Sequence, residues 1–164
     1  MKIMKINSYT TVTKTEYIYW NQGHNASKVF DAINKELIGN ALPTQCEIQD
    51  VSLGVFNGAK RYLVVAGQQE ELLIGISSQA YGDFLCVFVY LAIAPNVGSV
   101  LRGLTLGAMT GNAANVMQAG TLSKMNVADV REMNMFWAST LCCIEKALAD
   151  VGLTEQMRGF AGVN

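Results

Sequence analysis

The sequence predicts a single α+β domain, in which an antiparallel β-meander of about five strands packs against two helices. Four strand-like runs follow one another between residues 45 and 94, and the short turns between them make neighbouring strands antiparallel. Apolar residues recur at helical spacing before residue 40 and again after residue 126. The length of 164 residues fits one domain, taken as 1–164, with 154–164 as a mobile tail.

Residues 2–20 are rich in Ile, Thr, Val and Tyr, which is strand composition. Strict alternation would place every second residue on one face of this strand: Tyr9, Thr11, Thr13, Thr15, Tyr17 and Tyr19. Such a polar and aromatic face is typical of an edge or of a surface that meets a partner, and an ordinary half-buried strand is the alternative. The composition of residues 2–20 fits either one continuous strand or a hairpin broken near Lys14.

The first helix is predicted after the polar loop at residues 21–25. Asn25 is the candidate N-cap, because its side chain can accept a hydrogen bond from an early backbone N–H. Gly39 provides a C-terminal stop. The apolar face between them consists of Ala26, Val29, Phe30, Ile33 and Leu37.

The meander is predicted from four runs, at 45–56, 60–67, 72–78 and 84–94. The apolar phase slips by one residue near Asp50, which indicates a β-bulge. Asn57-Gly58 is a strong hairpin signal. The last run, Phe84–Ala94, is apolar on both faces, so a central or doubly covered strand is expected before Pro95 ends it.

Residues 96–123 allow several interpretations. Ser99, Gly103, Gly107 and Gly111 are spaced four apart, as in helices that approach closely through small residues. A glycine-rich loop, broken into turns at Gly98, Gly111 and Gly120, is equally compatible with the pattern. A strand at 115–122 is a further alternative.

The last helix is predicted from Val127 to about Val151, with Gly152 as its stop. Asn126 and Asp129 form a pair that resembles a capping box. No charge occurs from Met133 to Ile144, whereas a one-sided surface helix carries charges through its middle. We therefore expect one face on the sheet and the other on a helix or a second subunit.

Charged residues make up 15% of the chain and hydrophobic residues 51%, whereas a typical domain has about 25% charged residues. This shortage predicts exposed apolar area covered by a partner, unless Ser, Thr, Asn and Gln cover the surface instead. The net charge of −1 and the lack of a basic cluster argue against nucleic acid as a partner. No apolar leader or run of about 20 apolar residues occurs, which predicts a cytoplasmic location and argues against a membrane role.

The sequence predicts no catalytic residues, metal site or cofactor. His24 is the only histidine and is expected to be an exposed loop residue. The four cysteines form no CxxC motif and are predicted to be buried, reduced thiols. Arg102 is a lone charge in apolar surroundings, where it pairs with an acid such as Asp83, Asp129 or Glu132 or extends to solvent.

The order of helix, antiparallel meander and long C-terminal helix resembles that of the small acidic dimeric chaperones of secretion systems. The strand-like N-terminus, the fourth consecutive strand and the glycine row depart from that pattern. The resemblance is one of architecture without matching residues, and a shared fold alone does not fix function.

The sequence favours a non-enzymatic interaction or assembly protein that associates with itself or with another protein. The predicted interface consists of Ser99, Arg102, Gly103, Gly107, Gly111, Met133, Phe136 and Trp137. One alternative is a small-ligand binder or enzyme with a pocket between the sheet and the C-terminal helix. The other is a membrane-active protein that uses the glycine row.

Overall fold

The computed structural model describes residues 5–6, 9–52, 59–68, 72–94 and 127–153. It confirms the predicted α+β fold, with a five-stranded antiparallel sheet and two helices. The elements in chain order are β1 (Thr10–Tyr19), the 3₁₀ helix η2 (Gly23–Lys28), α1 (Val29–Gly39), β2 (Gln45–Ser52), β3 (Ala59–Ala66), β4 (Leu72–Tyr81), β5 (Phe84–Ile93) and α4 (Val127–Asp150).

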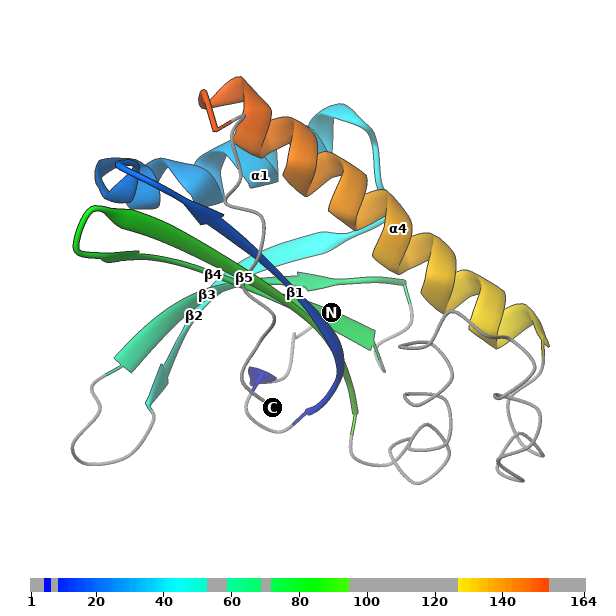
Figure 1. Ribbon diagram of the computed structural model, residues 1–164. Coiled ribbons are helices and arrows are strands. Elements are labelled where there is room, and N and C mark those ends of the chain that lie inside the picture. The colour runs from blue at the N-terminus through cyan, green and yellow to red at the C-terminus, as the bar shows by residue number, and fades with distance from the viewer. Residues whose placement is uncertain (1–4, 7–8, 53–58, 69–71, 95–126, 154–164) are drawn as a thin grey trace, which may run out of the picture.

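The sheet has the strand order β1-β5-β4-β3-β2. After β1, the chain passes through η2 and α1 to the opposite edge of the sheet and returns strand by strand to β5, which pairs with β1. Helices α1 and α4 lie on the same side of the sheet (Figure 1). In the described part of the chain, no α-helix lies on the other side, which is called the helix-free face below.

Strand β5 is central, as its apolar run predicts, because it pairs with β1 on one side and with β4 on the other. Alternate residues Leu85, Val87 and Val89 belong to the main core beneath the helices and are 0% exposed. The intervening residues, such as Phe88 and Tyr90, lie on the helix-free face and are only partly buried.

Strand β1 is one continuous edge strand, and the strict alternation predicted for it is wrong. The register against β5 shifts between Thr11 and Thr13, so Val12 joins the main core. Tyr17 and Tyr19 also lie in that core, whereas Tyr9 packs against a small cluster around Val64 on the other face. The bulge therefore separates Tyr9 from the two later tyrosines.

Strand β2 has no bulge near Asp50, contrary to the prediction. Its register with β3 runs unbroken from Gln45 to Ser52. The apolar residues change from one face of the strand to the other because different faces of this edge strand are buried at different points along its length. Ile48 is 53% exposed, whereas Val51, on the other face, is 8% exposed.

The predicted N-cap at Asn25 is also wrong. Asn25 lies inside η2, and the first α-helical turn begins after Lys28 without a side-chain cap. The Asn25 side chain instead donates to Gln22 Oε1 at 2.6 Å and accepts from Lys28 Nζ at 3.1 Å. It is 7% exposed, so these local bonds satisfy a buried amide.

Helices α1 and α4 both end as the sequence predicts. Gly39 is the last residue of α1, although the positive φ of 50° falls on Ala41. Gly152 follows α4 with a φ of 85°, which suits glycine. The helices are joined by Lys146 Nζ and Glu36 Oε2, 2.6 Å apart.

Among the described helices, none has the length and apolar character needed to cross a membrane. The predictions for residues 96–123, for Asn57-Gly58, for Asn126 and for the tail from residue 154 lie outside the described residues.

Candidate functional site

A pocket of about 590 Å³ opens beside the first half of α4, where β3 ends and β4 begins. The strand ends and α4 form two sides of the pocket, and the connector from α1 to β2 forms the third. The pocket is lined by Leu42, Pro43, Thr44, Gly67, Gln68, Leu72, Glu132, Met135, Phe136, Ala138 and Ser139. It therefore brings together three segments that are far apart in the sequence.

Phe136 is held in the pocket wall by close packing against Gly67. A Cβ atom added to Gly67 would lie 3.4 Å from the Phe136 ring, so the absence of a side chain lets the ring come close to the end of β3. Phe136 also packs against the main core, to which Leu72 belongs. The apolar wall is thus fixed by the same packing that joins α4 to the sheet.

The polar groups of the pocket are few. The Ser139 hydroxyl donates to the backbone oxygens of Met135 at 2.6 Å and Phe136 at 3.3 Å. The hydroxyl hydrogen of Ser139 is therefore used in a hydrogen bond within α4. Glu132 is the one charged side chain of the described lining residues, so the pocket suits an apolar group better than an ion.

Apolar surface continues outside the pocket. Met135 lines the pocket and is also 60% exposed. Ala138 is exposed on the same helix. Both residues belong to the uncharged stretch Met133–Ile144, so this side of α4 offers solvent an apolar surface.

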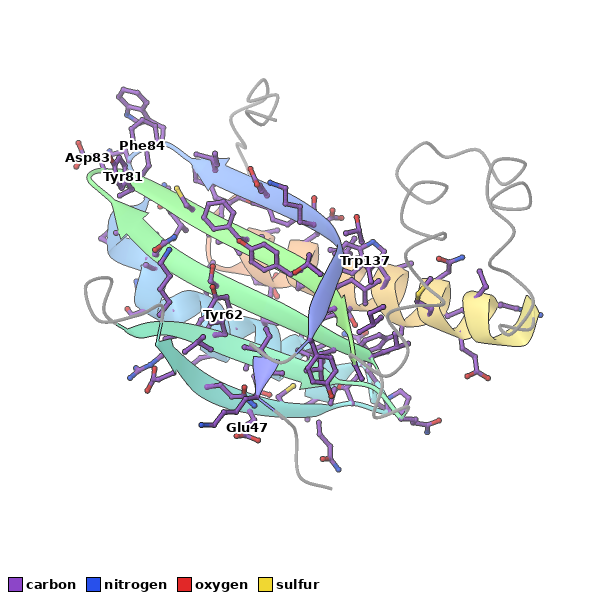
Figure 2. All side chains as sticks on the ribbon, turned by 90° about the horizontal axis from the view of Figure 1, so that it is seen from below. Glu47, Tyr62, Tyr81, Asp83, Phe84 and Trp137 are labelled. Atoms are coloured by element: carbon purple, nitrogen blue, oxygen red, sulfur yellow. The ribbon has the colours of Figure 1, made fainter. Side chains whose placement is uncertain are left out.

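The structure distributes the predicted interface residues of α4 over different environments. Phe136 lines the pocket. Met133 is 3% exposed in the core of the same chain, so a single copy does not present its side chain to a partner. Trp137 is half-buried against the main core (Figure 2). The other predicted residues, Ser99, Arg102, Gly103, Gly107 and Gly111, lie outside the described residues.

Sequence reasoning missed the pocket residues outside α4. Their sequence indicates only that Leu42 and Pro43 belong to a connector and that Gly67 and Leu72 are strand ends. A local pattern could not identify them, because they meet Phe136 only when the sheet ends beneath α4.

The cysteines are all free thiols. Burial raises the pKa of the Cys46, Cys86 and Cys143 thiols above the ordinary value, which disfavours the thiolate needed for nucleophilic chemistry. Cys143 is buried, Cys46 and Cys86 are partly buried, and Cys142 is exposed. The prediction of four buried thiols is therefore confirmed in full only at Cys143 and is wrong at Cys142. The Cys142 side chain falls on the outer face of α4.

His24 is exposed on η2, as the sequence predicts. Within the described ranges, no group of three or more His, Cys, Asp or Glu residues could hold a metal ion.

Two buried tyrosines of β1 lie near one carboxylate of α4. The Tyr17 hydroxyl donates to Glu145 Oε1 at 3.1 Å. Burial, with Glu145 nearby, raises the pKa of both Tyr17 and Tyr19 above the ordinary value. Because Tyr17 is only 6% exposed, this cluster connects the edge strand to the last helix.

The helix-free face of the sheet carries an aromatic band, and Tyr62 is its member on β3 (Figure 2). Tyr62 meets Tyr90 edge-on, with ring centroids 6.5 Å apart, and Phe88 stacks on Tyr90 at 6.4 Å. At the hairpin between β4 and β5, Trp20 meets Phe84 edge-on at 5.1 Å. The band is a second apolar surface, separate from the pocket.

Comparisons of the chain with protein-family models, with curated proteins and with solved structures find no match.

Proposed function

We propose that the chain is a non-enzymatic interaction domain that binds an apolar segment of another polypeptide in the pocket beside α4. The observation that carries this proposal is the mainly apolar pocket of about 590 Å³ beside the uncharged stretch of α4. A few residues that fill well-packed, desolvated pockets provide most of the binding energy in protein interfaces.

The surroundings of the pocket fit a polypeptide partner. Met135 extends apolar surface outside the cavity, and methionine adapts its flexible side chain to different partners. Glu132 and Gln68 supply polar atoms among the lining residues. An apolar centre with polar groups around it is the usual anatomy of an interface.

A substitution that fills the pocket tests the proposal. Ala138 lines the pocket and is exposed on α4, so Ala138→Trp fills the space at little expected cost to the fold. Ala149→Trp is the matched control, because Ala149 is an exposed alanine of the same helix outside the pocket lining.

The measurement is selection of 12-residue peptides from a displayed library against the immobilised chain. We expect enriched peptides with Leu, Phe or Met anchors, and binding by fluorescence anisotropy that falls at least tenfold in Ala138→Trp and is unchanged in Ala149→Trp. Enriched peptides that bind both variants equally, or a library without enrichment, would contradict the proposal.

A small apolar molecule is the second candidate occupant. The volume of the pocket falls within the range of about 300–1,000 Å³ that small-ligand sites occupy. Native mass spectrometry of the purified chain distinguishes this candidate, since it predicts an added mass that is lost on denaturation and is absent from Ala138→Trp. The peptide proposal predicts the mass of the chain alone.

A further inference from the structure

Strand β1 is a long edge, and beyond the register shift between Thr11 and Thr13 its pairing with β5 is regular from Thr13 to Tyr19. It has 10 residues and contains no proline, and it is at the edge of the described sheet. Edge strands of this kind can pair with another chain unless charges or prolines block them. The opposite edge, β2, carries the acids Glu47 and Asp50.

The charges of β1 are one lysine and one glutamate, which neutralise each other. Lys14 Nζ lies 2.9 Å from Glu16 Oε1, with side chains that are 55% and 28% exposed. Their partners on β5 are Tyr90 and Phe88, so both lie on the helix-free face of the sheet. Thr15, between them, lies on the helix side.

These positions specify one register for antiparallel pairing of β1 with a second β1. Residues directly opposite each other share a face, so a two-fold axis through Thr15 places Lys14 of each copy opposite Glu16 of the other. Two complementary pairs then form on one face, and the two Thr15 side chains meet on the other. An axis through Lys14 or Glu16 would instead bring like charges together, which is unfavourable.

We propose that two copies of this chain pair through β1 in this register and join their sheets into one continuous sheet. The axis is perpendicular to the sheet, so the helices of both copies lie on the same side. Each lysine exchanges its contact within the strand for Glu16 of the partner subunit. The interface is separate from the pocket beside α4, so each proposal can fail without the other.

Charge reversal tests the register. Lys14→Glu and Glu16→Lys each create like-charge pairs across the axis, so each should raise the dimer dissociation constant about tenfold or more. Equimolar mixing of these two variants should restore the dimer as a heterodimer, because every pair is then complementary. The double variant Lys14→Glu/Glu16→Lys should dimerise as the parent chain does.

Sedimentation velocity over about 1–100 μM, a range that covers typical weak association constants, measures these effects. Circular dichroism checks that each variant is folded. Glu47→Lys on β2 and Lys60→Glu on β3 are the matched controls, because they make the same charge changes at other exposed strand positions. The controls should leave the dissociation constant unchanged.

A parent chain that is monomeric up to 100 μM, an upper working limit for such contacts, would overturn the proposal. A dimer that neither single reversal weakens would also overturn it, since the copies would then meet elsewhere. Failure of the mixed variants to form the heterodimer would rule out the register centred on Thr15.

Discussion

The hydroxyl of Tyr17 donates a hydrogen bond to the carboxylate of Glu145 at 3.1 Å, across 128 positions of sequence. It links the edge strand β1, near the start of the chain, to the last helix. Since β1 has a strand neighbour on one side only in the described sheet, this contact is a second means of holding it in place.

Removal of this hydroxyl should destabilise the fold measurably. Tyr17→Phe keeps the buried ring and deletes the donor, so we expect the free energy of unfolding to fall by about 1 kcal/mol. Urea denaturation measures the change. Glu145→Gln should cost less, because its amide oxygen can still accept the bond, and an equal or larger loss in that variant would contradict the assignment.

Alkaline pH should weaken the fold through the same residue. The folded chain holds the pKa of Tyr17 above its unfolded value of about 10, because burial and Glu145 disfavour the phenolate. The stabilisation is complete below pH 10 and is lost as pH rises towards the folded pKa, since the unfolded chain releases its proton first.

Urea denaturation at pH 8, 10 and 11 tests this expectation. The free energy of unfolding should fall more steeply above pH 10 in the parent chain than in Tyr17→Phe, by up to about 1.4 kcal/mol per pH unit. Parallel pH profiles for the two proteins would show that Tyr17 does not titrate differently on folding.

Thr140 is a site where a substitution should stabilise the protein. Its side chain is 0% exposed, and its hydroxyl has no hydrogen-bond partner within the described residues. A buried polar group without a partner is unfavourable, so the isosteric Thr140→Val should raise the free energy of unfolding by about 1 kcal/mol. Thermal and urea denaturation measure the change.

The control at this position is Thr140→Ser, which keeps the hydroxyl and removes a methyl group. It should lower the free energy of unfolding by about 1 kcal/mol. If Thr140→Val is the more damaging of the two, the hydroxyl has a partner, such as a buried water.

Gly23 should resist substitution because the β4–β5 hairpin packs directly against it. A Cβ atom at Gly23 would lie 2.8 Å from the backbone oxygen of Gly82. The Gly23 N–H also donates to the Asp83 oxygen at 3.0 Å, so the two backbones cannot separate freely. Gly23→Ala should therefore lower the free energy of unfolding by about 1–3 kcal/mol.

Gly39→Ala is the matched control for that prediction. A Cβ atom at Gly39 would meet nothing within 4 Å, and alanine is the better helix former, so stability should be unchanged or slightly higher. Similar melting temperatures for Gly23→Ala and the parent chain would show that the hairpin can shift.

The sequence by itself determined the fold class, because its apolar periodicities reflect the geometry of strands and helices. The run Phe84–Ala94 predicted a central strand from its two apolar faces, and β5 lies between β1 and β4. The stop of α4 at Gly152 was also predictable, since a positive φ suits glycine. These signals depend on residues close together in the chain.

Tertiary structure decided the features that depend on where one element covers another. Asn25 has the residue type of a helix cap, yet its backbone enters a 3₁₀ helix and its amide bonds locally. The phase slip at Asp50 resembles a bulge, but uneven burial of an edge strand causes it.

The candidate site also contains one part that the sequence predicted and one part that only the tertiary structure shows. Phe136 was predicted as an interface residue from the uncharged stretch of α4. Leu42, Gly67 and Leu72 join it in the pocket only because the connector and two strand ends meet beneath that helix. Their local sequence cannot encode such a meeting, since it arises from packing between segments far apart in the chain.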